Sequence, residues 1–86
     1  MKYVILDVRE PYEFEQGHVD GAINIPSARL MNGAKELDAT PKDAKILVYC
    51  HTGSRSNVAQ HILKSQGYTD ITNGINKEQV EARFLR

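Results

Sequence analysis

The chain has 86 residues, and its 11 lysines and arginines are balanced by 11 aspartates and glutamates, so the formal net charge is zero. This length predicts one domain over residues 1–86, and the balanced charge gives no general attraction to nucleic acid or to an anionic membrane, so neither is expected as a partner. One cysteine cannot form an internal disulfide, and together with three scattered histidines it forms no metal-ligand pattern, so neither a metal nor a cofactor is expected.

The first half of the chain alternates between extended and helical patterns. Residues 2–8 are short, apolar and β-branched, which predicts a buried strand. Pro11 and its acidic neighbours predict one or two helical turns over residues 10–16. Glycines and a proline punctuate residues 17–26, which predicts a turn and then a short extended segment, and residues 27–44 favour an interrupted helix followed by a polar loop.

The second half begins with a strand and a longer helix. Residues 46–50 form an apolar run that predicts a second buried strand. Residues 56–67 carry apolar side chains at helical spacing, with Ser54 or Ser56 available as the N-cap and Gly67 as a left-handed stop.

The C-terminal part completes the predicted fold. Residues 69–72 predict a brief strand, residues 73–74 a turn, and residues 76–86 a closing helix with Val80, Phe84 and Leu85 facing inward. Strands that alternate with helices are typical of an α/β domain with a small, mainly parallel sheet flanked by helices.

Cys50 lies where a predicted strand ends and a predicted helix is about to begin. In an open parallel sheet, ligands bind beyond the carboxyl ends of the strands, and the next helix directs its free N–H groups and positive dipole end to the same place. Such a position beside a cation, here Arg55, lowers a cysteine pKa and favours the nucleophilic thiolate. Residues 51–54 allow a tight loop, with Gly53 at positive φ, whose N–H groups surround an anion. We therefore predict a solvent-accessible nucleophile; the alternative is an inert buried thiol.

Two stretches resemble one known family. Residues 50–56, Cys-His-Thr-Gly-Ser-Arg-Ser, are similar to the C-x-x-G-x-R-S active-site loop of rhodanese-like sulfurtransferases. Residues 6–26 resemble a second motif of the same family, which begins with D-V-R and ends with N-[IL]-P. The chain is as short as the single-domain sulfurtransferases of the phage-shock-protein E type, and residues 73–76 depart from the Gly-Gly turn that is usual in the family.

The resemblance implies a rhodanese-like fold and a sulfur-transfer reaction. Cys50 would be the catalytic residue, taking a sulfane sulfur from thiosulfate or a related small anionic donor as a persulfide. Cyanide or a thiol, possibly the cysteine of a partner protein, would then accept that sulfur. The implied substrate-binding residues are those that follow the nucleophile: His51, Thr52, Gly53, Ser54 and Arg55.

The same resemblance implies supporting residues around the loop. Arg55 would contact either the sulfonate end of the donor or a carboxylate that fixes the loop. Asp7, at the end of a buried strand, would accept hydrogen bonds from loop N–H groups, and Arg9 would pair with Glu13. His18 is expected to be a structural hydrogen-bonding residue, and the side chain of the histidine that follows the nucleophile is expected to point outward.

Other functions remain open at the level of sequence. A phosphatase or arsenate reductase of this fold uses a C-x5-R loop, but only four residues separate Cys50 from Arg55. A non-catalytic binding module commonly loses the cysteine that this chain keeps. A sulfur carrier that serves a partner protein is a further alternative.

The expected location follows from what the N-terminus lacks. The apolar run near the N-terminus, residues 3–6, is too short to cross a bilayer, and no signal-peptide pattern accompanies it. A cytoplasmic protein is expected, or a periplasmic one if an export signal has been removed.

Overall fold

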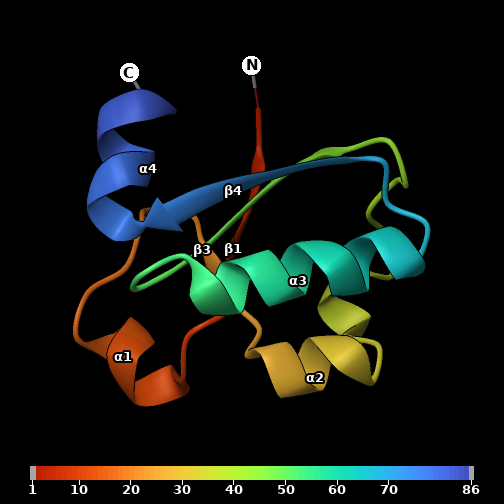
Figure 1. Ribbon diagram of the computed structural model, residues 1–86, viewed down its shortest axis with the longest axis horizontal. Helices are drawn as coiled ribbons and strands as arrows, with labels where there is room; N and C mark the ends of the chain where they lie inside the picture. The colour runs from red at the N-terminus through yellow and green to blue at the C-terminus, as the bar shows by residue number, and fades with distance from the viewer. Residues whose placement is uncertain (1, 86) are drawn as a thin grey trace.

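The computed structural model describes residues 2–85, in which four strands form one sheet (Figure 1). The strands lie in the order β2-β1-β3-β4, and every neighbouring pair is parallel. The predicted α/β fold with a parallel sheet flanked by helices is therefore confirmed. The elements in chain order are β1 (Val4–Asp7), α1 (Pro11–Glu15), β2 (Ile23–Asn24), α2 (Ser27–Met31), the 3-10 helix η1 (Lys35–Leu37), β3 (Lys45–Cys50), α3 (Ser54–Ser65), β4 (Asp70–Asn76) and α4 (Lys77–Arg83).

Both faces of the sheet are covered by helices. Successive side chains of a strand point to opposite faces. Leu6 and Val48 belong to the core on the side of α2 and α3, whereas Ile5 and Leu47 belong to the core on the side of α4. Figure 1 shows α4 and α3 on either side of β4. Because both faces are buried, the two central strands, β1 and β3, are largely continuous apolar runs rather than alternating ones.

The strand order places a crevice between β1 and β3. The chain passes from β1 to β2 on one side and later returns to β3 on the other side, which is the topological switch point of the sheet. Ligands of open α/β sheets bind outside the carboxyl ends of the strands at such a point. Cys50 is the last residue of β3, and Arg9 follows the end of β1, so both lie at this crevice.

The helix after Cys50 begins earlier than the sequence predicts. α3 starts at Ser54 with Gly53 as its N-cap, and no serine side chain caps it. Gly53 has a φ of 96°, a left-handed conformation that favours glycine. The predicted stop is confirmed, because Gly67 follows the helix with a φ of 100°.

β4 is longer than predicted, and the predicted turn at residues 73–74 is wrong. Val48 pairs with Asn73 and Tyr49 pairs with Ile75, so Gly74 is an extra residue that forms a bulge within the strand. A Cβ atom on Gly74 would lie 2.5 Å from Val80 Cγ2, which explains why glycine occupies this position. The bulge lets α4 pack directly on the sheet.

Two of the three residues predicted to face inward are placed correctly. Val80 is completely buried, and the ring of Phe84 packs edge-on against the ring of Tyr3 with 5.8 Å between ring centroids. The prediction for Leu85 is wrong, because Leu85 lies beyond the end of α4 and is 43% exposed. α4 follows β4 directly, so its first turn lies at the carboxyl edge of the sheet.

Candidate active site

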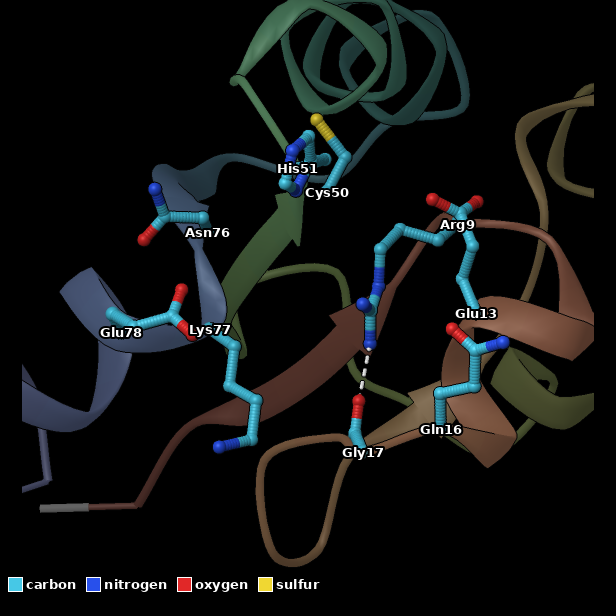
Figure 2. Close-up of a pocket in the computed structure, with 9 residues that line it drawn as sticks. All are labelled: Arg9, Glu13, Gln16, Gly17, Cys50, His51, Asn76, Lys77 and Glu78. Atoms are coloured by element: carbon cyan, nitrogen blue, oxygen red, sulfur yellow. Dashed lines mark hydrogen bonds between the residues drawn. The ribbon is translucent and has the colours of Figure 1, made fainter.

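A pocket of about 460 Å³ opens at the carboxyl edge of the sheet (Figure 2). The loop around α1 supplies one wall, the junction of β4 and α4 supplies another, and the end of β3 lies between them. Its lining residues are Arg9, Glu13, Gln16, Gly17, Cys50, His51, Asn76, Lys77 and Glu78. The candidate nucleophile is therefore one of the residues that line a pocket at the switch point of the sheet.

The sulfur of Cys50 lies inside a ring of hydrogen-bond donors. The backbone N–H groups of Gly53 and Ser56 donate to Sγ at 3.1 and 3.4 Å, and the Ser56 hydroxyl lies 3.4 Å from the same atom. Cys50 is only 1% exposed, so the prediction that it is solvent-accessible is wrong. Cys50 lines the pocket, and Figure 2 shows its sulfur pointing toward the start of α3.

These donors favour the ionised form of Cys50. Burial is the largest single influence and raises the pKa of the thiol. The Ser56 hydroxyl and the backbone N–H groups of Ser56, Gly53 and Thr52 act in the opposite direction, and together they hold the pKa of Cys50 below its ordinary value. Hydrogen bonds to a charged form stabilise it relative to the neutral form. The loop can therefore stabilise negative charge on sulfur without help from a metal.

A side chain from β4 completes the network around the sulfur. The hydroxyl of Ser56 donates to Asn73 Oδ1 at 2.7 Å, and Asn73 Nδ2 donates to the carbonyl of Gly53 at 3.1 Å. Ser56 is completely buried. Neither Ser56 nor Asn73 was predicted as a site residue, although Ser56 ends the motif that contains Cys50.

Arg55 turns away from the sulfur and binds a carboxylate on α1. Its Nη1 and Nη2 atoms donate to Glu13 Oε1 and Oε2 at 2.7 and 3.1 Å. Of the two roles predicted for Arg55, the geometry matches a carboxylate that fixes the loop. The predicted pairing of Arg9 with Glu13 is wrong, because Arg55 occupies this carboxylate. The hydrogen bond from Arg55 lowers the pKa of Glu13 to about 2.

Asp7 and Arg9 form a buried pair beneath the pocket. The Asp7 carboxylate is completely buried and accepts hydrogen bonds from the Arg9 backbone N–H at 2.9 Å and from Arg9 Nη2 at 2.7 Å. Arg9 Nη2 also donates to the carbonyl of Gly17 at 2.7 Å, as Figure 2 shows. The N–H group that Asp7 accepts is that of Arg9, directly after β1, and none of its donors comes from the loop that follows Cys50. Through its hydrogen bond to the Gly17 carbonyl, Arg9 fixes Gly17, which lines the pocket.

Tyr49 connects the Asp7–Arg9 pair to the segment between α1 and β2. Its hydroxyl donates to Asp7 Oδ2 at 2.8 Å and accepts the backbone N–H of Val19 at 3.0 Å. Burial raises the pKa of Tyr49 to about 12, so the hydroxyl stays protonated. Tyr49 therefore binds the end of β1 to the segment that precedes β2.

The remaining predicted residues lie at the surface of the loop. Thr52 and Ser54 are exposed, and their hydroxyls lie 3.2 Å from one another. Of the two, only Thr52 directs its backbone N–H toward Cys50. His51 is exposed and lines the pocket.

The structural role of His18 is confirmed, because its Nδ1 lies 2.8 Å from the carbonyl of Phe14 and its ring stacks on the Phe14 ring.

Residues 2–85 contain neither a metal-ligand cluster nor a membrane-spanning helix. No group of three or more histidine, cysteine, aspartate or glutamate side chains there is arranged to hold a metal ion. None of the helices in this range is long and apolar enough to span a bilayer.

Comparison with known proteins identifies the family. Residues 1–76 match the family described as the rhodanese-like domain, and the chain therefore belongs to the rhodanese-like family. A solved structure described as a rhodanese with anions from E. coli superposes with a TM-score of 0.80 at 34% identity, covering 91% of each chain.

Two curated relatives are named for sulfur chemistry. The chain is 42% identical over 71 residues to the thiosulfate sulfurtransferase PspE of Escherichia coli, covering 79% of this chain and 64% of the relative. It is 38% identical over 69 residues to the putative sulfur carrier protein YrkF of Bacillus subtilis, covering 80% of this chain and 36% of the relative. The chain thus matches between about one third and two thirds of the length of these relatives, and similarity to them supports sulfur transfer as its general chemistry.

Proposed function

We propose that the chain is a thiosulfate sulfurtransferase in which Cys50 carries the transferred sulfur. The Cys50 thiolate attacks the outer sulfur of thiosulfate or a related small anionic donor. A bond forms between Sγ and that sulfur, the sulfur–sulfur bond of thiosulfate breaks, and sulfite leaves with the bonding electron pair. Cys50 then carries a terminal persulfide sulfur with a negative charge.

The second half of the reaction regenerates the thiolate. Cyanide or a thiolate attacks the terminal sulfur, the bond to Sγ breaks, and Sγ keeps the electron pair. Cyanide leaves as thiocyanate, whereas a thiol acceptor leaves as its own persulfide. No oxidant, reductant or cofactor is consumed in either step.

The ring of donors around Sγ is the observation that carries this proposal. Gly53 and Ser56 direct N–H groups at the sulfur from fixed positions at the start of α3. Donors that are already in place stabilise an anion without reorganising during the reaction. We assign His51, Thr52, Gly53 and Ser54 to donor binding through the backbone of this loop, and Asp7 and Arg9 to support of the pocket wall.

The position of Arg55 argues against phosphate or arsenate chemistry. An arginine that clamps a tetrahedral oxyanion must point its guanidinium into the loop. Here both guanidinium branches of Arg55 are held by Glu13, and Arg55 is absent from the pocket lining. Sulfur transfer does not need such a clamp, because the charge to be stabilised develops on sulfur next to the backbone N–H groups.

Intact-mass spectrometry after incubation with thiosulfate tests the proposal. The native chain should gain the mass of one sulfur atom, and cyanide should remove it. Cys50→Ser should gain nothing, because a serine hydroxyl does not replace the sulfur nucleophile and the chain has one cysteine. A native mass that stays unchanged with thiosulfate and with other persulfide donors would overturn the proposal and favour a binding module.

The named relatives leave two classes of acceptor for the second step. A protein acceptor fits a carrier role, and a small thiol or cyanide fits a free-standing enzyme. Single-turnover release of sulfur from the loaded chain to cyanide, to a small thiol and to a reduced protein thiol separates these roles. Release to the protein thiol alone would assign the chain as a sulfur carrier.

A further inference from the structure

The Ser56 hydroxyl lies within reach of three acceptors but has only one proton to donate. Asn73 Oδ1 is the nearest at 2.7 Å, the Gly53 carbonyl lies at 3.2 Å, and Cys50 Sγ lies at 3.4 Å. Ser56 can therefore donate a hydrogen bond to only one of these three acceptors at a time. The state of Cys50 therefore decides which acceptor receives the proton.

When Cys50 is a neutral thiol, every group in the network is satisfied. The thiol donates its own proton to Ser56 Oγ, and Ser56 donates to Asn73. When Cys50 ionises, the thiol proton leaves to solvent and Ser56 Oγ no longer receives it. The thiolate is then the strongest acceptor within reach, because hydrogen bonds to charged groups are stronger than neutral ones. The Ser56 hydroxyl must rotate away from Asn73 in order to reach it.

We infer that Asn73 is a positioning residue that competes with the Cys50 thiolate for the single hydroxyl proton of Ser56. The inference rests on the proposed role of Cys50 as the sulfur nucleophile. Asn73 is well placed to compete, because the Ile75 N–H donates to the same Oδ1 atom at 2.9 Å and fixes the amide orientation. Asn73 Nδ2 also donates to the Gly53 carbonyl, which keeps the side chain beside the loop.

This competition links the network to the stage of the reaction. The free thiolate carries its negative charge on Sγ, whereas the persulfide carries its charge on the terminal sulfur. In the loaded state Ser56 returns its proton to Asn73, since the inner sulfur is neutral. Asn73 thus favours the thiol and the loaded state over the free thiolate. Without Asn73 only the longer contact with the Gly53 carbonyl, at 3.2 Å, would compete with the thiolate for the Ser56 proton.

The test is the pH dependence of Cys50 alkylation, which reads the thiolate directly and needs no sulfur transfer. Asn73→Ala should raise the ionisation constant of Cys50 by about three- to tenfold, the value of one neutral hydrogen bond. Loss of a purely structural contact would loosen the donor ring and move the inflection the other way. Asn73→Leu, which keeps the side-chain volume without polar atoms, should match Asn73→Ala and replaces it if the alanine variant does not fold.

Two further variants locate the effect. In a Ser56→Ala background, Asn73→Ala should leave the ionisation constant unchanged, because no shared proton remains. Gln60→Ala is the matched control, since Gln60 also donates from α3 to β4, at the Ile71 carbonyl, without contacting Ser56. It should leave the inflection where the native chain has it.

Charged groups around Cys50 do not change in any of these variants. Those that face it from the surrounding elements are Arg9, Glu13, His51, Arg55, Lys77 and Glu78. An unchanged or higher inflection in Asn73→Ala, or an equal shift in the Ser56→Ala background, would overturn the inference. Failure of sulfur loading in the native chain would instead overturn the proposed function and leave the alkylation result intact.

Discussion

Arg55 and Glu13 lie 42 residues apart in the chain and form a two-pronged ion pair across the rim of the pocket. The pair connects the first turn of α3 to α1, which has no buried residue of its own. α1 is therefore held against the rest of the domain mainly by contacts of this kind. The donor ring and one wall of the pocket are fixed relative to each other through these two side chains.

The first prediction concerns the role of this pair in sulfur transfer. Arg55→Ala and Glu13→Ala should lower the rate with thiosulfate by similar amounts, about two- to fivefold, as expected for a partly exposed ion pair. The double variant should be no slower than either single variant, because both remove the same contact. Single-turnover loading of Cys50 provides the rates. A much larger loss in Arg55→Ala alone would show that Arg55 contacts the donor.

The second prediction is a pH dependence of stability. Arg55 lowers the folded-state pKa of Glu13 from its ordinary 4.5 to about 2. A lowered carboxylate pKa contributes stability that is present above the unfolded value and is lost as the pH falls through the folded value. The difference in unfolding free energy between the native chain and Glu13→Gln should therefore be constant above about pH 5 and disappear towards pH 2. Urea titrations across this range measure it, and a difference that persists at pH 2 would contradict the assignment.

The third prediction compares two arginines that each bind a carboxylate. Arg9→Ala leaves the completely buried Asp7 without its charge partner and should cost about 3 to 5 kcal/mol of unfolding free energy. Arg29→Ala breaks an exposed pair with Glu36 and should lower the unfolding free energy far less than Arg9→Ala does. Urea unfolding at neutral pH measures both. Similar costs for the two variants would mean that Asp7 is satisfied without Arg9.

The fourth prediction tests the bulge in β4. Gly74→Ala places a methyl group against Val80 and should cost about 1 to 3 kcal/mol through overpacking. Combining it with Val80→Ala, which empties the same space, should give a double variant less destabilised than the sum of the two single variants. Thermal unfolding provides the comparison. Simple additivity would show that the added methyl is accommodated elsewhere.

Patterns that are local in sequence predicted much of this molecule. The apolar runs predicted the two central strands, and Gly53 predicted the tight loop after Cys50. Each of these features depends on neighbouring residues alone. Gly67 and Val80 were placed correctly for the same reason. The position of Cys50 at the carboxyl end of a parallel strand followed from the alternation of strands and helices.

Contacts between segments that are distant in sequence could not be predicted from local patterns. Arg9 and Glu13 are close in sequence and of opposite charge, yet the fold gives Glu13 to Arg55 and Arg9 to Asp7. The Asn73-Gly74 pair is a common turn signal, but pairing with β3 keeps it inside a strand. The bulge then places the side chain of Asn73 beside Ser56, which no local pattern indicates.

The pocket is built from two parts of different origin along the chain. Its sulfur-binding groups come from one short segment, residues 50–56, whereas its walls come from the α1 loop and the start of α4. Gln16, Lys77 and Glu78 supply none of the hydrogen bonds to the sulfur. Under the proposed function, the rim can therefore diverge in its choice of donor or acceptor while Cys50 and its donors stay the same, and these three positions are the natural ones to randomise when selecting for a new sulfur acceptor.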